Sequence, residues 1–326
     1  MYAKAGKLIL LCMLLFTGVH SIQAQRLRIV TTLPSLASIT EHVGGGHVVV
    51  NSITRGSQDA HYIEAKPSYM MQLHRADLLI YSGLELEIGW LPLLIQGARN
   101  QKVAVGSIGH LNASAALSEE NVVQKPRGEV DRSMGDVHPL GNPHYLLNPY
   151  HGLKVADLIA EKLIQLDPSH EQRYQQNLED FRRTLQSRIS DWERRASGLA
   201  GLEVVCYHPH WTYTLDWLGI INTGYIELRP GIPPSPKHKM AMTQLMQQRD
   251  IRIVIISSWK EPSKAEEVAK ASDATLVILP GEVRALGESE DYITWIDYVV
   301  SELVKTASGV VTPGRHRHRR QQRGTL

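Results

Sequence analysis

One stretch, residues 167–198, constrains the fold of this chain more than any other: DPSHEQRYQQNLEDFRRTLQSRISDWERRASG. Its apolar residues recur every three or four positions, which places them on one stripe of a helix. They are Tyr174, Leu178, Phe181, Leu185, Ile189 and Trp192. Asp167 is the predicted N-cap, and Gly198 the predicted left-handed C-cap. Such a helix spans roughly 45 Å at 1.5 Å per residue. A surface helix or a coiled-coil arm is the alternative, but a single stretch near mid-chain favours a rigid connection between two lobes.

The segments on both sides of this helix alternate strands with helices. Before it, apolar runs predict strands at 28–33, 47–53, 77–83 and 102–108. After it, similar runs predict strands at 203–209, 221–228, 251–258 and 274–280. This alternation is typical of parallel sheets covered by helices on both faces. The sequence therefore predicts an α/β protein with two α/β lobes, whose parallel sheets are joined by one long rigid helix.

The same pattern predicts how the chain is divided. In order, the parts are a signal peptide (1–24), an N-terminal lobe (25–166), the linking helix (167–198), a C-terminal lobe (199–310) and a disordered basic tail (311–326). In the first part, Lys4 and Lys7 precede an apolar run that is too short to span a bilayer. This arrangement is typical of a cleavable secretory signal, so we expect a protein that is exported from the cytoplasm.

Charge and cysteine content restrict the possible partners. The formal net charge of +2 includes two lysines of the signal peptide and five arginines of the tail, which leaves about −5 for the folded body. A negative body argues against a nucleic-acid surface. Cys206 is the one cysteine after the signal peptide, so no internal disulfide is expected. We interpret it as a buried, inert thiol.

Three histidines lie on loops that could meet at one place. His61 occurs in GSQDAHYIEAKPS, His144 in GDVHPLGNPHYLLNP, and His208 at the end of EVVCYHP. In open α/β sheets, ligands bind beyond the carboxyl ends of the strands. A single loop histidine is more often an ordinary polar surface residue. Three converging neutral imidazoles would bind a borderline-soft divalent cation, so together they predict a metal site.

These features resemble a known family. The order of elements, the long helix and the three histidine loops are similar to the solute-binding proteins of zinc and manganese ABC importers, the cluster A-I family, and especially to its ZnuA-like zinc members. The most specific segments are DAHYIEAKPS, NPHYLLNP, YHPHWTYTLDWLGI and SWKEPSKAEEVAK. The resemblance covers nearly all of the chain that follows the predicted signal peptide.

The resemblance implies a ligand set and a function. By it, His61, His144 and His208 are metal ligands, and an acidic residue in the loop ILPGEVRALGESEDY completes the site. Glu282 is the first candidate for that residue and Glu288 the second. Manganese-binding members tend to carry a carboxylate at the position of His208, so this histidine favours zinc. The implied protein is a monomeric, periplasmic, non-enzymatic protein that carries Zn²⁺ as its transported ligand to the membrane permease of an ABC transporter. Because zinc needs neutral imidazoles, affinity should fall as the pH drops through about 6.5.

Other functions remain open at this point. The same scaffold could carry manganese or another divalent metal, or could serve as a metal-dependent adhesin. A secreted zinc hydrolase would use His208, His210 and a carboxylate, with Glu282 or Glu64 as its base. The chain contains no H-E-x-x-H motif, which weakens the hydrolase interpretation. We therefore interpret His210 as a residue of the site's rim or as a support for its ligands.

Overall fold

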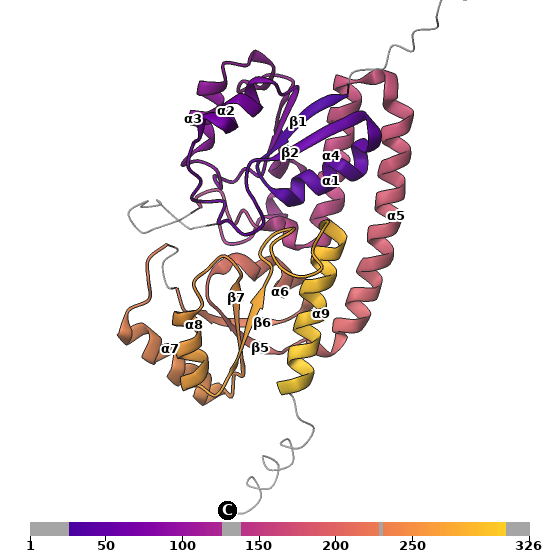
Figure 1. Ribbon diagram of the computed structural model, residues 1–326. Coiled ribbons are helices and arrows are strands. Elements are labelled where there is room, and N and C mark those ends of the chain that lie inside the picture. The colour runs from indigo at the N-terminus through magenta and orange to yellow at the C-terminus, as the bar shows by residue number, and fades with distance from the viewer. Residues whose placement is uncertain (1–25, 126–137, 228–230, 311–326) are drawn as a thin grey trace, which may run out of the picture.

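The computed structural model describes residues 26–125, 138–227 and 231–310. The predicted signal peptide and basic tail lie outside these residues. Two α/β lobes lie along one side of a long helix, α5 (Glu171–Ala196), which runs past both of them (Figure 1). Among the described residues, no helix has both the length and the apolar composition needed to cross a membrane.

Each lobe contains one four-stranded parallel sheet. The N-terminal sheet has the order β2-β1-β3-β4, and the C-terminal sheet has the equivalent order β6-β5-β7-β8. The strands of the first sheet are β1 (Leu27–Thr31), β2 (Val48–Ser52), β3 (Leu78–Tyr81) and β4 (His110–Asn112). Those of the second are β5 (Glu203–Cys206), β6 (Ile221–Tyr225), β7 (Ile253–Ser257) and β8 (Thr275–Leu279). The predicted fold class is therefore confirmed, and the two lobes share one topology.

Helices cover these sheets as the alternation predicts. The N-terminal lobe has α1 (Pro34–Gly44), α2 (Pro67–His74), α3 (Leu91–Ala98) and α4 (Pro149–Leu166). The C-terminal lobe has α6 (Thr212–Leu218), α7 (Pro236–Arg249), α8 (Ser263–Ala271) and α9 (Tyr292–Val310). Asn148 caps α4, because its side chain accepts a hydrogen bond from the backbone N–H of Tyr150 at 3.0 Å.

One predicted strand, at 102–108, is wrong. The chain instead forms a 3₁₀ turn at Gln101–Val103 and then a loop in which Val105 is 79% exposed. The edge strand β4 follows at His110–Asn112, paired with β3. An apolar run alone does not distinguish a buried strand from an exposed turn, and here Gly106, with a φ of 84°, turns the chain before it reaches the sheet.

The long helix is confirmed, but both of its predicted caps are wrong. A 3₁₀ turn at Pro168–His170 precedes α5, and a second one at Ser197–Leu199 follows it. The carboxylate of Asp167 accepts hydrogen bonds from the side chains of Ser169, His170 and Tyr174 and caps no backbone N–H. Gly198 lies inside the second turn, and the left-handed glycine is Gly201, with a φ of 80°.

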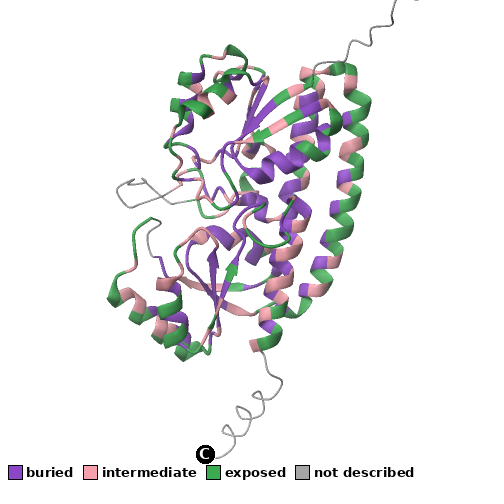
Figure 2. Ribbon diagram, in the orientation of Figure 1, coloured by how far each residue is buried: buried purple, intermediate pink, exposed green. Residues whose placement is uncertain are grey.

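The apolar stripe of α5 joins the cores of the two lobes. Tyr174, Phe181, Leu185, Ile189 and Trp192 are buried in one hydrophobic cluster that also contains residues of both sheets. The opposite face of the helix is exposed (Figure 2). Helix α5 contacts α1 and α4 of the N-terminal lobe and α9 of the C-terminal lobe. The helix is therefore a shared wall of both lobes.

Candidate metal centre

The three histidines predicted as ligands come together between the lobes. The ring centroids of His61 and His144 lie 5.2 Å apart, and the ring of His208 lies 6.1 Å from each of them. All three approach from strand ends: His61 from the loop after β2, and His208 from the end of β5. His144 lies beside the end of β3, because the neighbouring Tyr145 hydroxyl donates to the backbone carbonyl of Ser82 at 2.8 Å.

A carboxylate fixes the orientation of His61. Its Nδ1 lies 2.6 Å from Oδ1 of Asp59, two residues earlier in the chain. Because an ionised carboxylate can only accept, Nδ1 carries a proton, and in the neutral ring Nε2 then keeps the lone pair. Burial raises the pKa of Asp59, but the hydrogen bond from His61 and the charge of Lys260 outweigh it, so the pKa is held well below its usual range. Histidines that bind metals usually have such a carboxylate partner.

His208 has the same arrangement in the other lobe. Its Nδ1 lies 2.6 Å from Oε2 of Glu227, and both side chains are buried. Glu227 follows β6, the strand that pairs with β5, and its backbone N–H donates to the carbonyl of Tyr207 at 2.8 Å. Burial lowers the pKa of His208, and the nearby charge of Lys260 adds to this, while the hydrogen bond to Glu227 opposes it. The ring is therefore kept neutral, with Nε2 available.

His144 and His210 lie buried next to each other in the cluster. Their ring centroids lie 4.2 Å apart. Within the described residues, Nε2 of His144 and Nδ1 of His210 are buried without a hydrogen-bond partner. Nε2 of His210 donates to the carbonyl of Gly281 at 3.0 Å. Burial, followed by the charges of the other histidines, holds the pKa of both residues well below 6.5. An unpartnered, neutral imidazole nitrogen is what a metal ion requires, and His144 supplies one.

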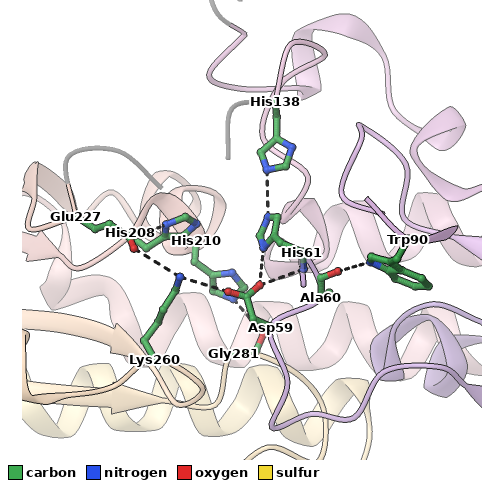
Figure 3. A network of polar contacts seen from close by, with 10 residues as sticks. All are labelled: Asp59, Ala60, His61, Trp90, His138, His208, His210, Glu227, Lys260 and Gly281. Carbon is green, nitrogen blue, oxygen red and sulfur yellow. Dashed lines mark hydrogen bonds and ion pairs between the residues drawn. The ribbon is translucent and has the colours of Figure 1, made fainter. Parts of the chain in front are cut away.

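His138 was not among the predicted ligands, although it lies at the cluster. Its Nε2 is 3.1 Å from Nε2 of His61 (Figure 3). Since the Nε2 of His61 carries the lone pair, His138 is the donor in this contact. A metal ion at His61 must therefore displace His138 or recruit it. The sequence offered one signal, because His138 is the single histidine between residues 111 and 142.

Glu282, predicted as the fourth ligand, is buried but turned towards α1. Its oxygens accept from the backbone N–H and the hydroxyl of Ser35, both at 3.0 Å, and from the backbone N–H of Val283 at 2.8 Å. Burial raises its pKa to about 7, although these hydrogen bonds oppose the shift. Glu288, the second candidate, is exposed. The role of Glu282 as a ligand stays a prediction.

The arrangement suits a soft or borderline cation more than a catalytic reaction. In the described part of the chain, no group of three His, Cys, Asp or Glu side chains is arranged so that it could hold a metal ion. Zinc bound to imidazole lies roughly 2.0–2.1 Å from each nitrogen, so the three rings would have to move to reach one ion. Cys206 takes no part: it is buried, as predicted, and burial raises the pKa of its thiol.

Two parallel α/β lobes beside one long helix, with neutral histidines gathered between them, define the class of two-lobed metal-binding solute-binding proteins. The family model described as zinc-uptake complex component A, periplasmic (ZnuA), matches residues 29–306, so the chain belongs to this family. The family comprises substrate-binding components of metal ABC transporters, so the prediction that the chain is not an enzyme is confirmed and the hydrolase alternative is wrong.

Curated relatives agree with this family. The chain is 31% identical over 160 residues to the manganese ABC transporter substrate-binding lipoprotein PsaA of Streptococcus anginosus, which covers 48% of this chain and 47% of the relative. It is 23% identical over 299 residues to PsaA of Streptococcus pneumoniae, which covers 88% of this chain and 90% of the relative. Several such alignments span only about half of the relative's length.

A solved structure has the same fold. The crystal structure of ZnuA aligns with a TM-score of 0.71 at 20% identity, and the alignment covers 86% of this chain and 99% of the other. At this identity, the likeness shows the fold alone.

Proposed function

We propose that this protein binds Zn²⁺ outside the cytoplasm and delivers it, as a monomer, to the membrane permease of an ABC importer. A cleaved segment 1–24 would direct its export, and the two lobes on either side of 167–198 would hold the ion between them. His61 and His144 from the N-terminal lobe and His208 from the C-terminal lobe are the proposed ligands. The cation is cargo, so the site needs to enclose it and later release it.

One observation carries this proposal. His61 and His208 come from different lobes, and each donates its Nδ1 proton to a carboxylate at 2.6 Å. Each ring therefore keeps an Nε2 lone pair, and His144 adds an unpartnered buried Nε2. Carboxylate-oriented imidazoles are the arrangement that proteins use to hold zinc. A three-nitrogen site favours zinc over manganese, which prefers oxygen ligands.

Manganese is the second candidate cargo. It is supported by the names of the curated relatives, which are manganese-transporter components. Against it stands the histidine at position 208, because a carboxylate there would give the harder site that manganese prefers.

Zinc titration of the metal-stripped protein tests the proposal. We expect one tight zinc ion per chain, retained in the presence of excess manganese. His61→Ala, His144→Ala and His208→Ala should each weaken zinc binding about 100-fold or more, because each removes a proposed nitrogen ligand. His42→Ala is the matched control, since His42 is an exposed histidine of α1 and should leave affinity unchanged.

The same titration addresses the fourth ligand. Zinc affinity should fall in Glu282→Gln if the carboxylate turns to the metal, and in His138→Ala if the imidazole is recruited instead. Zinc binding that survives all three proposed-ligand substitutions would place the ligands elsewhere and contradict the proposed site. Tighter binding of manganese than of zinc would replace the proposed cargo and leave the site intact.

A further inference from the structure

A partly exposed lysine connects the carboxylates that orient the two outer histidines. Nζ of Lys260 lies 3.3 Å from Oδ2 of Asp59 and 3.7 Å from Oε1 of Glu227 (Figure 3). The side chain of Lys260 is only 15% exposed, and those of Asp59 and Glu227 are 18% and 5% exposed. Lys260 follows β7 in the C-terminal lobe, while Asp59 belongs to the N-terminal lobe. The contact with Asp59 therefore crosses between the lobes beside the histidine cluster.

Each carboxylate is shared between an imidazole and this ammonium group. Asp59 accepts from His61 through Oδ1 and faces Lys260 through Oδ2. Glu227 accepts from His208 through Oε2 and faces Lys260 through Oε1. Residues His61, Asp59, Lys260, Glu227 and His208 thus form one continuous chain of contacts. Both ends of that chain are proposed ligands of the same ion.

The charges in this chain act in opposite directions before and after a cation binds. Without the cation, the ammonium group offsets one of the two carboxylate charges and stabilises the network. With a divalent cation at His61 and His208, the ammonium is a like charge in a poorly solvated region and repels it. The ammonium group also offsets the negative charge of the two carboxylates, and that negative charge is what makes the imidazoles better ligands. Both effects lower the affinity of the site for its cargo.

We propose that Lys260 is a positioning residue that weakens cation binding and speeds release of the cargo. The proposal rests on the proposed metal-binding function. It gives this chain a fixed positive charge that limits how tightly the closed lobes hold the ion. A protein that hands its cargo to a permease needs such a limit, because affinity above that of the next acceptor would retain the ion.

Lys260 could instead only stabilise the arrangement of the two lobes. The two roles predict changes of opposite sign in zinc affinity when Lys260 is replaced. Loss of a contact that stabilises the lobe arrangement would make the site less well ordered, so zinc binding would weaken. Removing a repelling charge would tighten the site, so zinc binding would strengthen. The sign of the affinity change therefore separates the two roles.

The test compares zinc affinity and zinc dissociation rate, measured by chelator competition, in the full-length mature protein and its variants. We expect Lys260→Gln to bind zinc about tenfold more tightly or better, with dissociation slowed to match, because one nearby repelling charge is lost. Lys260→Arg keeps the charge and should stay close to wild type. Lys264→Gln removes the same charge from a side chain that is 44% exposed and paired with Glu267, and should have little effect.

Weaker or unchanged zinc binding in Lys260→Gln would overturn the proposal while leaving metal binding by the wild type intact. Failure of the wild type to bind zinc would instead overturn the proposed function. Lys260→Met keeps the aliphatic stem and replaces the glutamine variant if that variant does not fold. If neither variant folds, the ammonium is a structural requirement and the tuning role is wrong.

Discussion

At His61 and His208, a neighbouring carboxylate decides which ring nitrogen is available to a ligand. Asp59 and Glu227 each accept the Nδ1 proton, so both rings present Nε2 to the space between the lobes. The Nε2 of His144 is buried and has no hydrogen-bond partner in the described structure, so it is available without a carboxylate that orients the ring. The chemistry of the site is therefore fixed by contacts of single side chains, and its protonation follows from the same contacts.

The pH dependence of zinc binding is also determined by single residues. Zinc requires neutral imidazoles, and burial lowers the pKa of both His144 and His208 below 6.5. A lowered pKa keeps a histidine neutral to a lower pH, so affinity should be retained as the pH falls through about 6.5 and should decline only below it. The sequence alone predicts a decline at about 6.5, so the burial of these two histidines moves the predicted decline to lower pH. Competition titrations from pH 7.5 to 5 would measure the midpoint, and a midpoint at or above 6.5 would contradict the lowered pKa values.

At the scale of single elements, α5 has the largest structural role. Its stripe of apolar residues is buried against both lobes, and its ends are tied by polar contacts. Near its C-terminal end, the Trp192 indole N–H donates to Asp297 of α9 at 2.7 Å. Nearer its start, the Asn177 amide donates to the carbonyl of Val43 at the end of α1 at 3.0 Å. Loss of packing at the middle of this helix should therefore weaken both lobes together.

Leu185→Ala tests this shared wall. Leu185 is fully buried in α5, so truncation leaves a cavity and should lower the free energy of unfolding by about 2 to 5 kcal/mol. Gln186→Ala is the control on the neighbouring exposed position and should change stability by less than about 0.5 kcal/mol. Chemical denaturation measures both. A single cooperative transition is expected in each variant, whereas separate transitions of the two lobes would contradict a shared core.

At the scale of the whole molecule, hydrogen bonds across the interface hold the lobes in one arrangement. The Asn142 amide donates to the carbonyl of Pro209 at 2.7 Å, and the Tyr213 hydroxyl donates to the carbonyl of Asn142 at 2.9 Å. The Tyr292 hydroxyl reaches the carbonyl of Leu146 at 2.7 Å. With the continuous core behind α5, these contacts favour a small tilt or a loop rearrangement over a wide hinge when cargo binds.

Gly56→Ala tests how closely the lobes must approach. A Cβ atom at this position would lie 2.2 Å from the carbonyl oxygen of Val283 and 2.6 Å from the backbone nitrogen of Ala285, in the other lobe. Backbone atoms cannot rotate away, so the variant should lose about 1 to 3 kcal/mol of stability and should bind zinc more weakly. Gly46→Ala is the control, because a Cβ there meets nothing within 4 Å. Thermal unfolding and zinc titration of both variants give the comparison, and equal behaviour would rule out this close approach.

The sequence by itself determined the helix stripe, the alternation of strands and helices, and the three histidine loops. These features are local, because periodicity and the order of strands depend on residues that are close together in the chain. The prediction failed where the outcome depended on a partner far away in the chain. The run at 102–108 has the composition of a strand but faces solvent, and Asp167 prefers nearby side-chain donors to the helix backbone.

Only the tertiary structure decided which charged residues lie beside the histidines. Asp59, Glu227 and Lys260 lie on three separate loops and form no spacing motif, and surface residues of these types are common. They come together because the carboxyl ends of the parallel strands meet at one place, where each charged group depends on its neighbours. The direction of Glu282 towards Ser35 was decided in the same way, by long-range packing that no local pattern encodes.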